Sequence, residues 1–262
     1  MDYTLNIKGR LLGLEKPLVM GILNVTPDSF YAASRKQTER EVAERAREMI
    51  DQGAAIIDVG ACSTRPGSTP VAQDEEMMRL RMALGAVRSV CPEATVSVDT
   101  FRPDVARMAV EEMGADIIND VEGNETMVRM VARLQVPYVL MASEPTMRDT
   151  LLFFAERVQQ LRDMGQKDII LDPGFGFGKT LEQNYELLAQ LEHLQVMELP
   201  VLVGVSRKSL IYKLLGIEPE GALNGTSVLN TIALMKGASI LRVHDVKEAV
   251  ECCKLLSSLS RG

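Results

Sequence analysis

The chain has 262 residues, enough for one large α/β domain or two small ones. Hydrophobic residues make up 46% of it and charged residues 25%, as in ordinary soluble proteins with one sizeable core. The net charge of −7 argues against nucleic acid as a general partner, because phosphate backbones are bound by basic surfaces. A phosphorylated small molecule is not excluded, since it needs only a local basic cluster.

The cysteines show neither metal-ligand spacing nor a C-x-x-C motif, so they indicate reduced thiols. The first residues lack the apolar run of a signal peptide, and no stretch approaches 18 apolar residues. We therefore expect a cytoplasmic protein without a membrane span.

Taken in order, the chain repeats an apolar strand followed by a helix. Residues 3–15 alternate weakly and predict a hairpin that plugs one end of a barrel. Strands are expected at residues 17–24, 55–61, 95–98, 116–118, 137–142, 168–171, 200–205 and 238–241. Helices are expected at residues 38–52, 74–90, 103–113, 124–134, 146–164, 181–194, 227–236 and 247–260. Gly53 is the expected C-cap of the first helix, and Asp74 the expected N-cap of the second.

Eight such units have the length and rhythm of a (β/α)₈ barrel. We predict a single-domain TIM barrel over residues 1–262, with a short N-terminal β-hairpin. An open, doubly wound sheet is the alternative fold, because periodicity alone does not distinguish a sheet that closes from one that does not. The count of eight units and the absence of an opening G-x-G-x-x-G motif favour closure.

The stretch DIILDPGFGFGKT, residues 168–180, shows the repeated device most clearly. Its apolar run ends at Asp172, Pro173 stops the strand, and three glycines alternate in the turn that follows. A carboxylate at the carboxyl end of a buried strand indicates a candidate active-site residue. The letters GFGFGKT resemble the tail of a nucleotide P-loop, but proline stands where that motif requires its first glycine.

Polar residues stand at the carboxyl ends of most predicted strands, where barrels carry their active sites. One group suits the edge of a polar heterocycle, and the other suits an anion such as phosphate or pyrophosphate. They are Asp99, Asn119 and Asp172 for the heterocycle, and Arg65, Lys208, Arg242 and His244 for the anion.

Each residue also has a simpler interpretation. Asp99, Asp172 and His244 could cap the helices that follow them, and Lys208 with Arg207 could be solvated loop charges. Lys208 could also be the Schiff-base lysine of a barrel aldolase, but such a lysine usually stands among apolar neighbours within its strand. Independent helix caps would not place groups of matching chemistry at the ends of most strands. Their joint occurrence therefore favours a single binding site.

Eight segments in chain order resemble the successive motifs of the dihydropteroate synthase family of pterin-binding barrels. The resemblance covers nearly the whole chain, and STRPG together with SRKS is its most specific part. It implies condensation of 4-aminobenzoate with 6-hydroxymethyl-7,8-dihydropterin pyrophosphate, with release of pyrophosphate, on the way to folate. The segments are MGILNVTPDSF (20–30), DVGACSTRPGSTPV (58–71), VSVDTFRPDVA (96–106), IINDV (117–121), ILDPGFGFGKT (170–180), GVSRKSLI (204–211), NGTSVLN (224–230) and ILRVHDV (240–246).

The family's functional positions carry over to this chain residue by residue. The resemblance implies that the pterin is bound by Asp99, Asn119, Met141, Asp172, Phe177 and Lys208. It implies that pyrophosphate is bound by Thr64, Arg242 and His244, and that Asn24 binds Mg²⁺. It implies an aminobenzoate pocket formed by Phe30, Arg65, Pro66, Ser206 and Lys208. The residues expected to contribute most to catalysis are Asp172, Lys208, Asp99 and Arg65.

Two loops depart from the family pattern. Residues 31–34 (YAAS) stand where the family often has Ser-Asp-Gly-Gly, and residues 141–145 (MASEP) replace its His-Met-x-Gly. The second change leaves Met141 as a pterin contact but removes the family's histidine from this loop. The other substituted positions lie outside the pterin and anion groups, so we expect an active enzyme.

Two other functions are weighed against the synthase. A methyltransferase of the same fold, which moves a methyl group from methyltetrahydrofolate to a corrinoid, would bind the ring similarly but needs no pyrophosphate site. A non-catalytic pterin-binding paralogue would bind pterin without releasing pyrophosphate. The resemblance also implies a homodimer, formed through the last helices.

Overall fold

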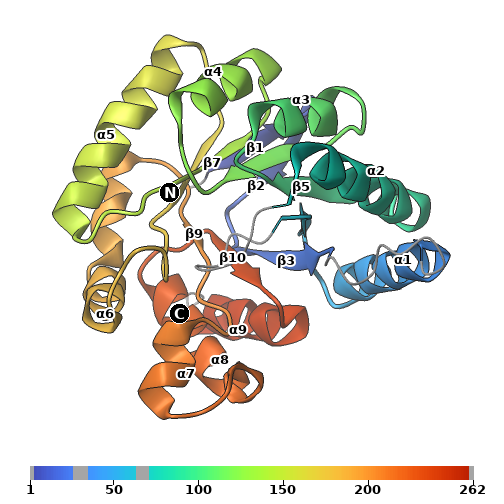
Figure 1. Cartoon of the computed structure of the whole chain (residues 1–262). Coiled ribbons are helices and arrows are strands. Elements are labelled where there is room, and N and C mark those ends of the chain that lie inside the picture. Colours follow the sequence, from blue (N-terminus) through green and yellow to red (C-terminus); the bar gives the residue numbers. More distant parts are fainter. Residues whose placement is uncertain (1–2, 26–34, 63–70, 260–262) are drawn as a thin grey trace.

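The structure is a computed structural model that describes residues 3–25, 35–62 and 71–259. Its centre is an eight-stranded parallel sheet with helices arranged around its outer side (Figure 1). The strands are β3 (Leu18–Asn24), β4 (Ile56–Gly60), β5 (Thr95–Asp99), β6 (Ile117–Asp120), β7 (Tyr138–Met141), β8 (Ile169–Asp172), β9 (Leu202–Val203) and β10 (Ile240–Val243).

The sheet closes into a barrel. Strands β3 to β8 pair in chain order, and β10 pairs with both β3 and β9. A parallel bridge joins Leu171 of β8 to Val201, just before β9, and the Leu171 N–H donates to the Pro200 carbonyl at 2.9 Å. The predicted barrel is therefore confirmed over the open, doubly wound sheet.

The outer layer consists of α-helices that follow the strands (Figure 1). Among the described residues, no helix is long and apolar enough to cross a membrane. The helices are α1 (Arg35–Asp51), α2 (Gln73–Val90), α3 (Pro103–Glu111), α4 (Glu125–Leu134), α5 (Met147–Asp163), α6 (Leu181–Ala189), α7 (Ser209–Leu215), α8 (Leu223–Met235) and α9 (Val246–Leu259).

Most predicted helix starts agree with the structure to within a few residues, with one wrong cap. The N-cap of α2 is Ala72, which makes no side-chain cap, so the assignment of Asp74 is wrong. Asp74 lies instead in the first turn, where its charge favours the helix dipole. The predicted helix 181–194 ends at Ala189, and a 3₁₀ helix, η2 (Leu191–Met197), follows it.

Inward-facing side chains fill the barrel in two layers, because every second residue of a strand points inward. The lower layer is apolar and includes Ile56, Ile117, Ile170 and Ile240, packed into one cluster. Two residues further along the same strands, the upper layer holds polar groups. The polar positions that follow these isoleucines are Asp58, Asn119, Asp172 and Arg242.

The N-terminal hairpin closes the amino-terminal end of the barrel, as predicted. Its strands β1 (Thr4–Ile7) and β2 (Arg10–Gly13) pair antiparallel, and Leu5 and Ile7 join the lower apolar layer. Lys8 at its turn forms an ion pair of 2.8 Å with Asp116, the residue before β6. The plug is therefore held by both apolar contact and charge.

Asp116 receives several hydrogen bonds at this end of the barrel. Burial alone would raise the pKa of Asp116, but donors on Lys8, the Val96 N–H and Arg88 outweigh burial and lower it. A carboxylate with a lowered pKa stabilises the fold above its unfolded pKa, about 4, and this contribution is lost as pH falls through the folded value.

We expect Asp116→Asn to lower the free energy of unfolding at pH 7 by about 1.5–3 kcal/mol, the range for hydrogen bonds to a charged group. The difference from the unmodified chain should shrink as the pH falls below about 4, because Asp116 is protonated first in the unfolded chain and, at still lower pH, in the folded chain. Urea unfolding between pH 7 and pH 3 measures it. Asp51→Asn, the same change at an exposed position, is the control, and equal losses in the two variants would contradict the plug's role.

Candidate active site

The upper polar layer lies at the carboxyl ends of the strands and contains most of the predicted site residues. Arg242 of β10 is its most connected member. Its Nε donates to Asp58 at 2.6 Å, and its Nη2 donates to Asp99 at 2.6 Å. Asp58 also accepts a hydrogen bond of 3.0 Å from Asn119. Four strands are thus joined by one chain of contacts.

The two carboxylates share the charge of one guanidinium. Burial alone would lower the pKa of Arg242, but Asp58 and Asp99 outweigh burial and raise the pKa above its usual range, so Arg242 stays charged. Burial raises the pKa of Asp99 to about 7 against the pull of Arg242, and the Asp58 charge adds to the increase. Both Asp58 and Asp99 keep one buried oxygen, Oδ1, without a hydrogen-bond partner among the described residues. Such acceptors suit a ligand that brings N–H donors.

A second group gathers around Asp172 and Lys208. The Lys208 ammonium donates to the Phe175 carbonyl at 2.5 Å and lies 4.6 Å from the centre of the Phe177 ring. Burial lowers the pKa of Lys208 to about 8, although Asp172 acts against this decrease. Burial likewise raises the pKa of Asp172, and Lys208 opposes that shift.

The glycine-rich turn after β8 is fixed by close main-chain contact. The Gly174 N–H donates to Asp172 at 2.8 Å, and Gly174 has a left-handed backbone with φ of 67°. A Cβ at Gly174 would lie 2.0 Å from the Ala142 carbonyl oxygen, so a side chain there is excluded. Met141 of β7 pairs with Asp172 in register, which places it beside the carboxylate, as a pterin contact requires.

Ser206 and His244 form a third contact at this end of the barrel. Ser206 Oγ accepts from the His244 N–H and lies 3.1 Å from His244 Nδ1. Ser206 therefore fixes the orientation of the imidazole, whichever of the two ring nitrogens carries the proton. Ser206, expected in the aminobenzoate pocket, is buried beside a predicted pyrophosphate residue.

The simpler interpretations of the charged residues fail for four of them. Asp99 and Asp172 are not helix caps, since α3 is capped at Arg102 and α6 at Thr180. Lys208 is bound as described, and Arg207 makes a two-pronged ion pair with Asp245, both distances being 2.8 Å. Neither is a solvated loop charge.

Asn24 ends β3 at the same mouth and is exposed. A Cβ at Gly60 would lie 3.3 Å from Asn24 Oδ1 and 3.6 Å from the Asp99 Cβ, so Asn24 and Asp99 flank Gly60. The predictions for Phe30, Thr64, Arg65 and Pro66 lie outside the described residues.

The sequence reasoning passed over Asp58, which anchors both Arg242 and Asn119. A signal was present: Asp58 is charged within an otherwise apolar strand, two residues after an inward-facing isoleucine. Arg207 was noticed only as a possible loop charge, although its left-handed backbone, with φ of 53°, and its Asp245 pair fix the segment between Ser206 and Lys208. That pairing spans 38 residues, and nothing local in the sequence indicates it.

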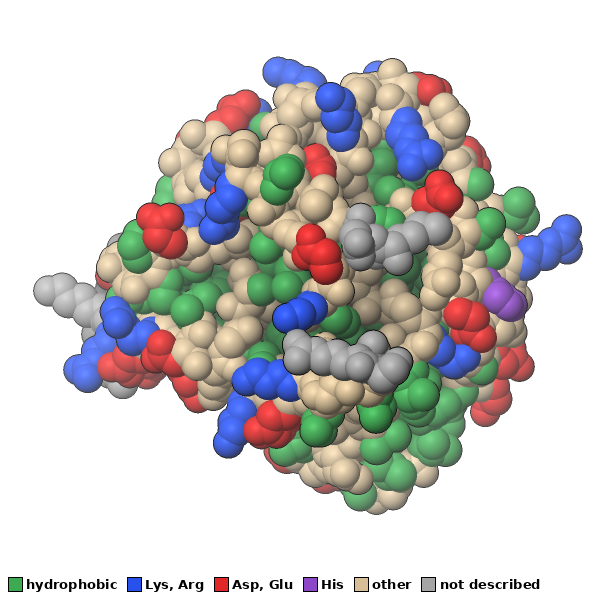
Figure 2. Space-filling view, turned by 180° about the vertical axis from the view of Figure 1, so that it is seen from behind, with side chains coloured by type: hydrophobic (Ala, Val, Ile, Leu, Met, Phe, Trp, Pro, Cys, Tyr) green, Lys and Arg blue, Asp and Glu red, His purple; other side chains and the backbone are tan. Residues whose placement is uncertain are grey.

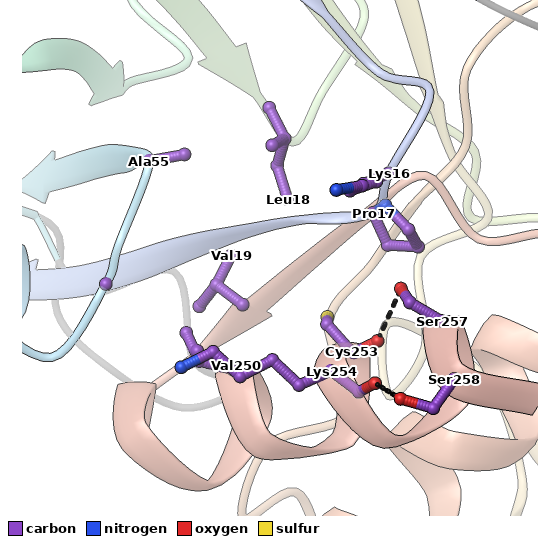
Figure 3. A pocket seen from close by; sticks show the side chains of 11 residues that line it. Lys16, Pro17, Leu18, Val19, Ala55, Val250, Cys253, Lys254, Ser257 and Ser258 are labelled. Atoms are coloured by element: carbon purple, nitrogen blue, oxygen red, sulfur yellow. Dashed lines mark hydrogen bonds between the residues drawn. The ribbon is translucent and has the colours of Figure 1, made fainter.

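Two surface cavities lie away from this site, at the amino-terminal face. One, of about 360 Å³, lies between the start of β3 and α9 and is lined by Leu18, Val19, Ala55, Val250 and Cys253 among others (Figure 3). The other, of about 480 Å³, lies beside the ends of α1 and α2. Neither contains a predicted site residue, so the polar layer remains the candidate site.

Comparison with known proteins agrees with this geometry. The family described as "Pterin binding enzyme" matches residues 20–244. Dihydropteroate synthase of Escherichia coli (strain K12) is 39% identical, covering 96% of this chain and 94% of that protein, and the synthase of Bacillus subtilis (strain 168) is 40% identical, covering 94% and 89%. The chain belongs to the dihydropteroate synthase family. The structure of Xanthomonas albilineans dihydropteroate synthase with 4-aminobenzoic acid superposes with a TM-score of 0.93 at 36% identity, covering all of both chains.

Within the upper polar layer, Asp58 accepts hydrogen bonds from both Arg242 and Asn119 and should orient them. We expect Asp58→Ala to weaken binding of an oxidised pterin about 10- to 100-fold, because Asn119, predicted to bind the ring, and its neighbour Arg242 both lose a charged hydrogen-bond partner. Asp58→Asn, which keeps an acceptor, should lose less. Isothermal titration calorimetry measures both variants.

Ser97→Ala is the matched control, since Ser97 pairs with Asp58 in register and its buried Oγ has no hydrogen-bond partner among the described residues. Equal losses in Asp58→Ala and Ser97→Ala would contradict a specific role for Asp58.

Proposed function

We propose that this chain condenses 4-aminobenzoate with 6-hydroxymethyl-7,8-dihydropterin pyrophosphate to give 7,8-dihydropteroate and pyrophosphate, an alkyl or aryl transfer other than methyl transfer. The observation that carries the proposal is the joint placement of Asp99, Asn119, Asp172, Lys208 and Arg242 in one buried polar layer at the barrel mouth. The relatives reported above are synthases, which favours this reaction over methyl transfer to a corrinoid.

The polar layer suits the edge of a pterin. Pterin presents ring N–H and NH₂ donors beside a ring nitrogen and a carbonyl acceptor. Asp172 and Asp99 offer carboxylate oxygens to the donors, while Lys208 and Asn119 offer N–H groups to the acceptors. Met141 and the Phe177 ring provide apolar surface for the ring faces.

The reaction breaks the bond between the pterin methylene carbon and the pyrophosphate oxygen, then forms a carbon–nitrogen bond to the arylamine. Positive charge develops on the pterin as pyrophosphate leaves. The Asp172 carboxylate, buried and fixed by the Gly174 N–H, stabilises that charge without reorganising. The neutral arylamine then attacks and releases one proton, so no general base is required.

The anion groups lie on the neighbouring strands. His244 is held by Ser206, which contacts both its backbone N–H and its ring Nδ1, so the other ring nitrogen, Nε2, is the one that remains for a pyrophosphate oxygen. Arg242 is fixed in plane by its two carboxylates and keeps its charge. Thr64 completes the proposed pyrophosphate set, and Phe30, Arg65 and Pro66 complete the aminobenzoate pocket with Ser206 and Lys208.

We further propose Mg²⁺ as the metal, bound through Asn24. Among residues 3–25, 35–62 and 71–259, no group of three or more His, Cys, Asp and Glu side chains could hold a metal alone. One exposed carboxamide oxygen fits magnesium, which takes most of its ligands from substrate phosphates and water. When bound, the ion would neutralise the charge of the leaving pyrophosphate.

Two features support a homodimer in the cytoplasm. Exposed apolar side chains lie on the last two helices, with Val228 50% and Met235 70% exposed on α8, and Leu255 71% and Leu259 77% exposed on α9. Figure 2 shows apolar side chains gathered on the lower part of the molecule, where α7 and α8 lie in Figure 1. None of the four cysteines forms a disulfide in the structure, as expected in a reducing compartment.

The proposed reaction is tested by pyrophosphate release from purified protein given the pterin pyrophosphate, Mg²⁺ and 4-aminobenzoate. Release should depend on the arylamine and fall at least about 100-fold in Lys208→Ala and in Asp172→Asn, because each removes a preorganised charge from the reacting ring. Lys213→Ala, an exposed position on α7, should leave the rate unchanged. Pterin binding without arylamine-dependent release would refute the synthase and favour the non-catalytic paralogue.

The proposed dimer is tested by sedimentation. Burying an unpaired charge between two copies of the chain is costly. Leu255→Glu places such a charge on the exposed apolar face of α9, so it is expected to shift the sedimenting mass from two chains to one. Glu251→Lys, on an exposed position of the same helix, is the comparison variant. A wild-type chain that sediments as a monomer would contradict the dimer.

A further inference from the structure

Lys179 closes the glycine-rich turn behind Asp172, and the site described above assigns it no role. Its ammonium lies within hydrogen-bond distance of three main-chain carbonyls, those of Gly174 at 3.0 Å, Ala142 at 3.3 Å and Phe177 at 3.4 Å. Ala142 follows β7, and the other two residues follow β8. One half-buried side chain therefore ties together the ends of two neighbouring strands.

The turn that Lys179 holds is the one that orients Lys208. The carbonyl of Phe175 accepts the hydrogen bond from Lys208, and the Phe177 ring lies against the same ammonium. Asn184 supports the turn from the other side, since its Oδ1 accepts the Gly176 N–H at 2.7 Å. Lys179 thus acts on the site through the main chain, without contact to the reacting atoms.

We propose that Lys179 is a positioning residue, whose ammonium fixes the turn of residues 174–177 so that Asp172 and Lys208 meet the pterin in one arrangement. The inference rests on the proposed function, because it assumes that Asp172 and Lys208 bind that ring. Lys179 has two effects on the site. Its hydrogen bonds fix the turn, and its positive charge acts on Asp172 and Lys208. The experiment below separates the two.

The electrostatic effect follows from the charges around the pair. Asp172 faces Lys208, Arg242 and Lys179, and all three favour its ionised form. Lys208 faces Asp172 and Asp99, which favour its protonated form, and Arg242 and Lys179, which oppose it. Removing the Lys179 charge therefore raises the pKa of Asp172 and also that of Lys208. Both shifts have the same sign.

Glu144 supplies the opposing charge. It lies in the loop after β7, and its negative charge acts on Lys179. Its Oε2 is buried and has no hydrogen-bond partner among the described residues. Removing this charge makes the surroundings of Lys179 more positive, so it should change the site in the direction opposite to removal of Lys179.

The test is the pH profile of kcat/KM for pyrophosphate release. Its acid limb reports ionisation of the site carboxyls Asp99 and Asp172, of which Lys179 acts on Asp172, and its basic limb reports loss of the Lys208 proton. In Lys179→Met we expect both limbs to move to higher pH by about half a unit or more, the lower end of the effect of one nearby charge. The KM for the pterin substrate should rise about tenfold, and the KM for 4-aminobenzoate should change less.

A merely structural role predicts a different profile. If the turn only loosened, water would enter, the pKa of Asp172 would fall and that of Lys208 would rise, so the profile would broaden. Lys179→Arg keeps the positive charge, so both limbs of its pH profile should lie at the wild-type pH values. Lys167→Met removes an equal charge at the amino-terminal end of β8, and it should move neither limb.

Glu144→Gln keeps the inference falsifiable if Lys179→Met does not fold, and it should move both limbs to lower pH. An unmoved or broadened profile in Lys179→Met, or an upward shift in Glu144→Gln, would overturn the role of Lys179 while leaving the synthase intact. A wild-type chain without arylamine-dependent release would instead overturn the proposed function, and this inference with it.

Discussion

In a closed parallel barrel every strand directs alternate side chains into the same narrow interior, and this constraint decides where chemistry can lie. The lower positions are filled by apolar residues, four of them isoleucines, and covered by the hairpin, which excludes water from that end. The next inward position lies within two residues of the end of the strand. A polar residue placed there is buried on its sides yet open to a ligand above, so one rule places polar groups from β4, β5, β6, β8 and β10 in one layer.

Burial at that layer makes the charges depend on one another. Arg242 stays charged because two carboxylates accept its hydrogen bonds. The same guanidinium offsets the repulsion between Asp58 and Asp99. Lys208 and Asp172 limit each other's pKa shifts in the same way. The groups are therefore oriented before any ligand arrives, which is the condition for stabilising a developing cation without reorganisation.

The sequence predicted the parts of this arrangement that depend on local pattern. The eight strand–helix units, the hairpin plug and the strand-end residues Asp99, Asn119 and Asp172 follow from periodicity and from where each apolar run stops. Residues 184 and 143 positions apart meet at Arg242, and no local pattern indicates such a pairing. The error at Asp74 has a different cause, because the acids of a first turn resemble a cap, whereas the N-cap of α2 is Ala72, two residues earlier.

The loop after β7 shows why a departure from the family pattern need not remove function. Its side chains differ from the family's His-Met-x-Gly, but the contacts that it makes to the site are largely main-chain contacts. The Ala142 N–H donates to the Asp172 carbonyl at 2.8 Å, and the Ala142 carbonyl lies against Gly174 and the Lys179 ammonium. A backbone carbonyl is supplied by any residue, whereas the glycine opposite it is required. The constraint at this position therefore falls on the turn after β8 rather than on the loop that differs.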